Sequence, residues 1–288
     1  MKELVYLNGD FLPREEAKIS PDDRGFIFAD GIYEVIKYYH GVPFCFNDHM
    51  ERLKYSLSQI SLTFKNPHEL EGIILKLLET NGLMRDDAGV YIQITRGAAK
   101  RVHYFTDSEP TIYIFTFPFQ ANIKDLMHGI NVITDKDIRW HRCDIKSVSL
   151  LPNIMLFDKA HKNGAGETIM VRNGIVTEAT HSSVIGVMEE KIYTHPLSNH
   201  ILPSITRKVV LEICKNENIQ VVEKAITEEM LNYLDELMIT GTGSEITPVV
   251  RLNSKPIKNG IPGVITKRLQ KLFFEKVYTT LPANKRWW

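Results

Sequence analysis

Lys146 is the residue of this chain that is best placed for covalent chemistry. It lies in residues 139–150 (RWHRCDIKSVSL), where two arginines, a histidine and an aspartate precede it. A lysine with an ordinary pKa of about 10.4 is protonated at neutral pH and is a poor nucleophile. Neighbouring cations and partial burial lower the pKa of a lysine, and the neutral amine can then form an imine with a carbonyl group. Most lysines are solvated surface charges, so this interpretation depends on what the rest of the chain supplies.

An imine with a lysine is how proteins hold pyridoxal 5'-phosphate (PLP), and this cofactor needs further groups around it. They are an acid that faces the pyridine nitrogen, a phosphate site, a wall for the ring and a group that holds the substrate carboxylate. Glu178, in residues 174–183 (GIVTEATHSS), is the candidate acid because it follows a predicted hairpin strand. An acid there keeps the pyridine nitrogen protonated, so that the ring withdraws electrons from the substrate carbanion. Taken alone, Glu178 fits an ordinary loop glutamate better.

The candidates for the phosphate site lie at the start of a predicted helix and in a glycine-rich turn. The helix in residues 204–214 (SITRKVVLEIC) offers backbone N–H groups and the positive end of its dipole, with the Thr206 hydroxyl beside them. Thr242, with a glycine on either side, adds a hydroxyl where the backbone can approach a phosphate closely. Arg52 adds a guanidinium that can bind a phosphate bidentately. Hydroxyls at a helix start also serve as simple caps. Capping and phosphate binding have the same physical cause, because both satisfy the free N–H groups of the first turn.

Strands and helices alternate along the chain, which predicts a mixed fold of the α/β (α+β) class. Hairpin turns are predicted at the Asn-Gly pair of residues 8–9, at the His-Gly pair of residues 40–41, and at residues 172–174. Residues 236–250 are typical of a strand, a glycine-rich loop and a second strand. Apolar residues at helical spacing predict helices after Asp48 and over residues 154–161, 204–216, 228–236 and 266–277.

Length and composition are those of a globular protein with room for two hydrophobic cores. The 288 residues are 43% hydrophobic and 24% charged. We expect a smaller N-terminal domain over residues 1–119, a linker over residues 120–124 and a larger C-terminal domain over residues 125–288. Lys+Arg and Asp+Glu are equal at 35 each, and this balance argues against nucleic acid or an anionic membrane as the main partner.

The cysteines and the apolar segments bear on the compartment. Cys45, Cys143 and Cys214 are scattered without metal-ligand spacing, so neither a disulfide framework nor a metal site is predicted. No apolar run approaches the roughly 20 residues of a membrane span. The N-terminus lacks the apolar core of a signal peptide. The sequence therefore predicts a protein of the reducing cytoplasm.

Six segments of the chain together carry a family resemblance. In this order they resemble the fold-type IV PLP-dependent transaminases, and within that family the bacterial D-amino-acid transaminases, over nearly the whole chain. The resemblance implies a smaller N-terminal α/β domain and a larger C-terminal domain with the cofactor at their interface. The segments are residues 23–41, 94–105, 137–151, 176–183, 202–207 and 240–249.

The same resemblance implies a role for each candidate residue. Lys146 would form the Schiff base and then move a proton between the substrate Cα and the cofactor C4′. Glu178 would pair with the pyridine nitrogen, while Glu34 and Arg139 would occupy supporting positions near the lysine and the cofactor. Tyr33 would lie beside the substrate. The positions that match phosphate ligands are Arg52, Ile205, Thr206 and Thr242, the second and third of these through backbone N–H groups.

Arg101-Val102-His103, together with Tyr33, are candidates for binding the α-carboxylate of the substrate, and we call them the carboxylate trap. The planar guanidinium of Arg101 suits a carboxylate, although an ordinary polar loop explains Arg101 and His103 equally well without the family. In the family this loop reaches the active site of the neighbouring subunit, which implies a homodimer. The implied reaction moves amino groups between D-amino acids such as D-alanine and D-glutamate and 2-oxo acids such as pyruvate and 2-oxoglutarate.

Three residues depart from the family pattern and leave alternatives open. His181 and Ser183 stand where serine and asparagine are expected, and Gly241 stands where serine is expected. Three other activities of the family therefore remain as alternatives: branched-chain L-amino-acid transaminase, (R)-amine transaminase and aminodeoxychorismate lyase. Enzymes with these activities share the cofactor site but lack the Arg-x-His sequence, which argues against them. A non-catalytic PLP-binding protein is a weaker alternative, because a mere binder needs no carboxylate trap.

Overall fold

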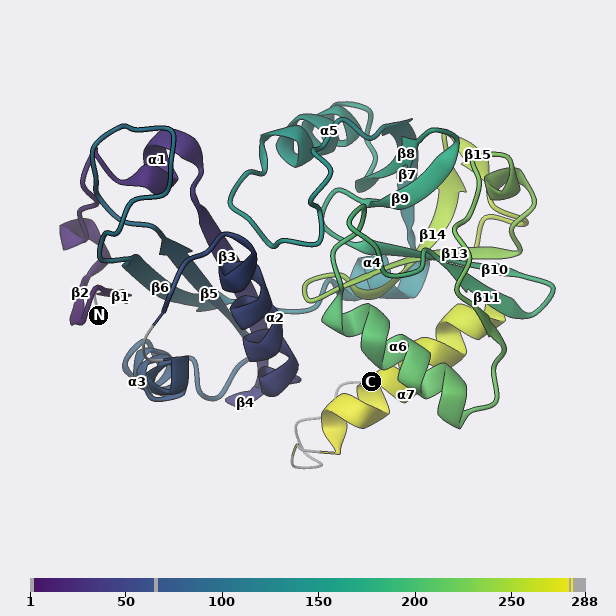
Figure 1. Cartoon of the computed structure of the whole chain (residues 1–288). Coiled ribbons are helices and arrows are strands. Elements are labelled where there is room, and N and C mark those ends of the chain that lie inside the picture. Colours follow the sequence, from purple (N-terminus) through teal and green to yellow (C-terminus); the bar gives the residue numbers. More distant parts are fainter. Residues whose placement is uncertain (1–2, 65–66, 280, 282–288) are drawn as a thin grey trace. The chain divides into compact units, whose positions relative to one another are not determined.

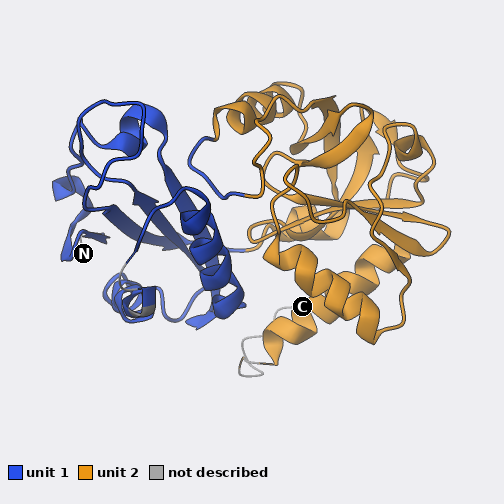
Figure 2. Ribbon diagram, viewed as in Figure 1, with its two compact units in different colours: residues 1–120, 145–149 blue, residues 121–144, 150–288 orange. Residues whose placement is uncertain are grey.

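The computed structural model describes residues 3–64, 67–279 and 281, and divides into two compact units (Figures 1 and 2). Unit 1 consists of residues 1–120 and 145–149, and unit 2 of residues 121–144 and 150–288. The short segment 145–149, which contains Lys146, thus belongs to unit 1 although the chain on either side of it belongs to unit 2.

Unit 1 is built on a six-stranded sheet with the strand order β2-β1-β6-β5-β3-β4, and each neighbouring pair is antiparallel. The hairpins predicted at residues 8–9 and 40–41 are confirmed. Both residues of each turn have positive φ angles, 50° and 109° in the first and 48° and 82° in the second. The strands are β1 (Leu4–Leu7), β2 (Asp10–Pro13), β3 (Gly31–Tyr39), β4 (Val42–Pro43), β5 (Ala88–Thr95) and β6 (Thr111–Pro118).

The core of unit 1 lies between this sheet and two helices, α2 (Phe46–Gln59) and α3 (Leu70–Thr80). Leu53 and Leu57, one turn apart on α2, are buried in the cluster that holds Ile32 and Ile36 of β3. Full burial of such a side chain contributes about 1.5–3 kcal/mol, so this contact fixes α2 on the strand that carries Tyr33 and Glu34. The unit also contains the short helix α1 (Arg24–Phe28) and the 3-10 turns η1 (Arg14–Glu16) and η2 (Pro67–Glu69).

Unit 2 is built on a nine-stranded mixed sheet with the order β12-β11-β10-β13-β14-β7-β8-β9, in which β15 pairs with β14. The pairs β11–β12, β14–β7 and β7–β8 are parallel and the others antiparallel. The strands are β7 (Ile130–Lys136), β8 (Glu167–Arg172), β9 (Ile175–Ala179), β10 (Ser183–Met188), β11 (Lys191–Thr194), β12 (Val221–Val222), β13 (Glu236–Gly241), β14 (Glu245–Leu252) and β15 (Lys255–Pro256).

Four helices of the described chain pack against strands of this second sheet. α6 (Ile205–Asn216) and α7 (Val264–Tyr278) contact each other and β13, while α5 (Leu151–Lys162) packs on β7 and β8. α4 (Ile123–His128) lies on β14. The predicted helices at 154–161, 204–216 and 266–277 are therefore confirmed, and so is the mixed α/β class.

The helix predicted over residues 228–236 is wrong. The structure has only a three-residue 3-10 turn there, η3 (Met230–Asn232). Leu231 and Leu234 have the helical spacing that suggested the prediction, and both are buried in the core cluster of unit 2. Because β13 already begins at Glu236, one turn suffices to bury both leucines and no room remains for a longer helix.

Two further properties of the described chain bear on the predictions. None of its helices is both long and apolar enough to cross a membrane. Its three cysteines are free thiols, of which Cys143 and Cys214 are buried. Burial raises the pKa of both buried thiols to about 11, which keeps them neutral and fits a packing role for Cys143.

Candidate active site

Lys146 is fixed in unit 1 through its backbone. Its N–H donates to Ser56 Oγ at 3.1 Å and its carbonyl accepts the N–H of Tyr33 at 2.9 Å. Val148 N–H donates to the Gly31 carbonyl at 3.1 Å, so segment 145–149 runs along the start of β3. The Nζ atom of Lys146 lies 4.2 Å from the centroid of the Tyr33 ring, a cation–π contact. The structure thus brings together the predicted nucleophile and the predicted substrate neighbour.

Arg52 and Glu34, also in unit 1, form a buried bidentate ion pair. Arg52 donates from Nε to Glu34 Oε2 at 2.9 Å and from Nη2 to Oε1 at 2.6 Å. His49 Nδ1 lies 3.0 Å from the same Oε1. Burial alone would raise the pKa of Glu34, but Arg52 and His49 outweigh it and hold that pKa well below its usual range. Glu34 is therefore an ionised anchor for the arginine.

His49 was not among the site residues predicted from the sequence. It stands three residues before Arg52 on α2, so both side chains lie on one helix face, and this spacing was the available signal. Burial lowers the pKa of His49, Glu34 opposes that effect, and the positive charges of Arg52 and Lys146 lower the pKa further. His49 therefore links the Glu34–Arg52 pair electrostatically to Lys146.

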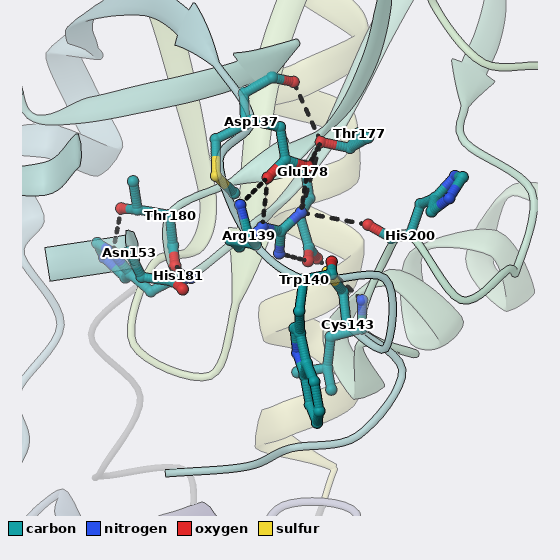
Figure 3. A network of polar contacts seen from close by, with 12 residues as sticks. Asp137, Arg139, Trp140, Cys143, Asn153, Thr177, Glu178, Thr180, His181 and His200 are labelled. Carbon is teal, nitrogen blue, oxygen red and sulfur yellow. Dashed lines mark hydrogen bonds and ion pairs between the residues drawn. The ribbon is translucent and has the colours of Figure 1, made fainter. Parts of the chain in front are cut away.

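Glu178 lies on β9 in unit 2 and contacts Arg139, as Figure 3 shows. Arg139 Nη1 donates to Glu178 Oε1, and the backbone N–H of Leu202 donates to Oε2 at 3.1 Å. Burial raises the pKa of Glu178, while Arg139 and the Leu202 N–H lower it only in part. The result is a buried carboxylate with an elevated affinity for a proton.

This environment fits the ring nitrogen of PLP. A carboxylate has room for about four hydrogen bonds, and within the described chain each oxygen of Glu178 accepts one. An acceptor position therefore remains for a pyridinium N–H. The negative charge of the ionised carboxylate also favours the protonated form of such a nitrogen.

The candidate phosphate groups also lie in unit 2. The first turn of α6 leaves the N–H groups of Ile205 and Thr206 without intrahelical acceptors, and both residues are buried. Ser204 is the N-cap, its Oγ accepting the N–H of Arg207 at 3.2 Å. Thr242 is half-buried in the turn between β13 and β14, and α6 packs on β13. Free N–H groups at a helix start with threonine hydroxyls form a donor set suited to a phosphate dianion.

Gly241, where the family resemblance predicts a serine, lies against two serine hydroxyls. A Cβ at this position would lie 2.9 Å from Ser244 Oγ and 3.3 Å from Ser182 Oγ. Those two hydroxyls hydrogen-bond each other at 3.0 Å and so connect the loop after β9 to the turn that carries Thr242. A glycine at 241 leaves space for this pair.

His181, the second departure, is held by a buried acid that was not predicted from the sequence. Glu167 Oε1 accepts the backbone N–H of His181 at 3.1 Å and lies 3.0 Å from its Nδ1. Glu167 Oε2 accepts the Thr180 hydroxyl. Although burial raises the pKa of Glu167, His181 and Thr180 bring it below its usual value. The imidazole edge packs on Phe157 with ring centroids 5.0 Å apart, so the loop after Glu178 is tied down at both residues.

Arg101 and His103 are exposed in unit 1 and lie around Phe28. The Arg101 guanidinium carbon is 5.1 Å from the Phe28 ring centroid, and the His103 ring is 5.6 Å from it. Two arginines of the same region behave differently, because Arg24 and Arg96 each donate to Asp30 at 2.8 Å. No carboxylate of the described residues pairs with Arg101, which leaves its charge available for a ligand carboxylate.

Comparison with known proteins places these features in a family. The profile of the amino-transferase class IV family matches residues 31–252. The D-alanine aminotransferase of Staphylococcus haemolyticus is 42% identical over 272 residues, 93% of this chain and 96% of that protein. That of Bacillus licheniformis is 40% identical over 268 residues, 92% and 94% of the two chains.

Solved structures show the same fold. A branched-chain aminotransferase from Thermoproteus uzoniensis with norvaline has a TM-score of 0.89 and 26% identity, covering 98% of this chain and 96% of that one. A branched-chain amino acid aminotransferase from Thermobaculum terrenum in its PLP form has a TM-score of 0.87 and 23% identity, covering 100% and 97%. The identity is thus higher with the D-alanine aminotransferases than with these two branched-chain enzymes.

Proposed function

This chain belongs to the class IV aminotransferases, and we propose that it is a D-amino-acid transaminase. It exchanges amino groups between D-amino acids such as D-alanine and D-glutamate and 2-oxo acids such as pyruvate and 2-oxoglutarate. The observation that carries this proposal is the 42% identity, over 93% of the chain, with a D-alanine aminotransferase. The exposed Arg101, which pairs with no carboxylate of the described chain, supports it as the site for the substrate carboxylate.

PLP, when bound, supplies the aldehyde that takes up the amino group and a ring that withdraws electrons from the substrate Cα. Lys146 Nζ would hold the cofactor covalently and is the amine of the described site that could accept and return the proton of the substrate Cα. Glu178 holds the proton on the pyridine nitrogen. Tyr33, in contact with Lys146 Nζ, limits where that amine can move.

The cofactor phosphate is bound by charge and by backbone donors. The N–H groups of Ile205 and Thr206 and the hydroxyl of Thr242 donate to its oxygens. Arg52 supplies the positive charge, oriented by its two hydrogen bonds to Glu34.

The working form in this proposal is a cytoplasmic homodimer in which Arg101 and His103 reach the active site of the other subunit. Exposed apolar residues support an assembly. Leu151, Ile154 and Met155 are exposed at the spacing of one face of α5, and Tyr104 and Phe105 are exposed beside the Arg101 loop.

The test is the absorbance spectrum of the PLP-loaded enzyme with single amino acids. D-alanine should shift the visible band, because the cofactor takes up the amino group, and L-alanine should leave the band unchanged. A shift with L-valine or L-leucine in place of D-alanine would assign a branched-chain transaminase. A band that no amino acid shifts would indicate a PLP-binding protein without this activity.

A further inference from the structure

The Asp137 side chain is buried in unit 2, next to the pair that Arg139 forms with Glu178 (Figure 3). Asp137 follows the end of β7 and its N–H donates to the Val171 carbonyl at 2.8 Å. The parallel pairing of β7 with β8 thus continues to this residue and fixes its position. Asp137 was given no role on the basis of the sequence.

The three donor nitrogens of Arg139 make unequal contacts with two acids, and Nη2 also donates to the His200 carbonyl at 3.2 Å (Figure 3). Nε and Nη2 donate to the two carboxylate oxygens of Asp137, at 3.0 and 2.9 Å. Only Nη1 donates to Glu178. The side of the guanidinium that carries Nε and Nη2 faces Asp137, so Glu178 receives a single hydrogen bond, from Nη1.

Asp137 is itself held by other groups. Arg172 Nη2 lies 3.1 Å from Asp137 Oδ2, and the Thr177 hydroxyl donates to the same oxygen at 2.9 Å. Burial raises the pKa of Asp137, but Arg139 and Thr177 reverse that effect and lower it to about 2. Asp137 therefore stays ionised beside Arg139.

We propose that Asp137 is a positioning residue for Glu178: by engaging Nε and Nη2 of Arg139, it leaves Glu178 with an open acceptor position and a negative charge for the cofactor ring nitrogen. This inference rests on the proposed function insofar as the ligand is PLP. Without the Asp137 carboxylate, the bidentate side of Arg139 can turn to Glu178, occupy both its oxygens and neutralise it.

The test compares PLP with 1-deaza-PLP, which has carbon in place of the ring nitrogen, in binding to the cofactor-free protein. Asp137→Asn keeps the shape of the side chain and removes its charge. We expect PLP to bind about tenfold more weakly to this variant, as for one weakened charge-assisted hydrogen bond, and 1-deaza-PLP to bind as it does to the native chain. The quantity measured is the ratio of the two dissociation constants, which a general loss of structure leaves unchanged.

Asp135→Asn is the matched control. Asp135 is on β7, two residues before Asp137, but its side chain pairs with the exposed Lys159 at 2.6 Å, so its removal should not alter the ratio. Should Asp137→Asn fail to fold, Thr177→Val keeps every charge, removes one hydrogen bond to Asp137, and should change the ratio in the same direction by a smaller factor. An unchanged ratio in the variants that fold overturns the inference. Failure of the native protein to bind PLP would instead overturn the proposed function, so the two failures are distinguishable.

Discussion

Two buried glutamates of this chain, Glu34 in unit 1 and Glu178 in unit 2, each contact an arginine, yet their pKa values are shifted in opposite directions. The pKa of Glu34 lies below the usual range, because Arg52 binds it with two hydrogen bonds and His49 adds a third. The pKa of Glu178 is raised, because burial dominates and Arg139 gives it only one contact. Contact with an arginine therefore does not by itself fix the direction of the pKa shift of a buried acid. The number of hydrogen bonds that the arginine donates to the acid also matters.

The difference separates an acid that holds a ligand-binding arginine in place from an acid that can serve as a ligand itself. Glu34 uses its acceptors on residues of its own unit and orients Arg52. Glu178 keeps an acceptor position and a high proton affinity, which suits a pyridine nitrogen. Substitutions that break one property and leave the other test this contrast.

The largest effect is expected outside both acids, at Lys146. Neither glutamate has an amine that could bind the cofactor in place of Lys146. Lys146→Ala should therefore lower steady-state transamination by about 10⁴-fold, while the chain still folds. The measurement is turnover of D-alanine with 2-oxoglutarate, with circular dichroism as the folding control. Near-native turnover without added amines would show that this lysine is misassigned.

Glu34→Gln should mainly reduce stability. It leaves Arg52 buried with a neutral partner, and loss of one member of a buried ion pair costs about 3–5 kcal/mol. Urea unfolding of the cofactor-free protein at pH 7 measures this loss. Asp48→Asn, on the first turn of the same helix, is the control, and a loss as small as that of the control would remove Glu34 from its anchoring role.

The pH dependence of this stability follows from the direction of the shift. Because the pKa of Glu34 is lower in the folded than in the unfolded chain, its contribution is complete above the ordinary glutamate pKa of about 4.3. It is lost as the pH falls through the lowered folded value. The contribution of the Glu34 charge itself to the stability difference between the native chain and Glu34→Gln should therefore not depend on pH above about pH 5.3, one unit above that ordinary value, and should shrink in more acidic solution. His49, which contacts Glu34, adds its own pH dependence near the ordinary histidine pKa of about 6.5, so urea unfolding is compared above and below that value.

Glu178→Gln should mainly reduce the rate. The amide cannot keep the pyridine nitrogen protonated, and a lost charge-assisted hydrogen bond of about 1.5–3 kcal/mol corresponds to a 10- to 100-fold slower half-reaction with D-alanine. Stability should change less than in Glu34→Gln, because Arg139 keeps Asp137 as its partner. Stopped-flow absorbance gives the rate, and an unchanged single-turnover rate would move the role of the acid to another residue.

Arg101 extends the comparison to an arginine without an acid partner among the described residues. Arg101→Ala should raise KM for D-alanine and D-glutamate by about 10- to 100-fold, the equivalent of one charge-assisted contact, and leave PLP affinity unchanged. His103→Ala should act in the same direction more weakly, since it removes a single hydrogen bond. Lys100→Ala is the control, because Lys100 is an exposed cation next to Arg101. If Arg101→Ala slowed the reaction of amines that lack a carboxylate as much as that of D-alanine, Arg101 would not be the group that binds the substrate carboxylate.

Local patterns in the sequence were enough to predict much of this molecule. The hairpin turns follow from their turn residues, and the cap at Ser204 follows from its place before an amphipathic helix. A local sequence pattern does not show which distant segments of the chain will pair with each other. The placement of Lys146 on β3 depends on backbone hydrogen bonds across more than a hundred residues, and Asp137 reaches Thr177 only because β7, β8 and β9 are neighbours. The helix prediction for residues 228–236 failed because leucines at helical spacing are buried equally well by a single turn.

Another buried glutamate, Glu167, gives the smallest expected effect. Besides the backbone N–H groups of Thr168 and His181, two side chains of one loop contact it: the buried Thr180 hydroxyl and the His181 ring, whose side chain is 55% exposed. Thr180→Val leaves the buried Oε2 atom with the Thr168 N–H as its donor and removes one of two hydrogen bonds, at a cost of about 1–3 kcal/mol. His181→Ala removes a contact that solvent screens, which contributes about 0–1 kcal/mol. Urea unfolding of both variants measures the order of the two losses. If His181→Ala were the more destabilising, the ring and not the hydroxyl would hold Glu167 ionised, and exposure would be the wrong guide to the strength of these contacts.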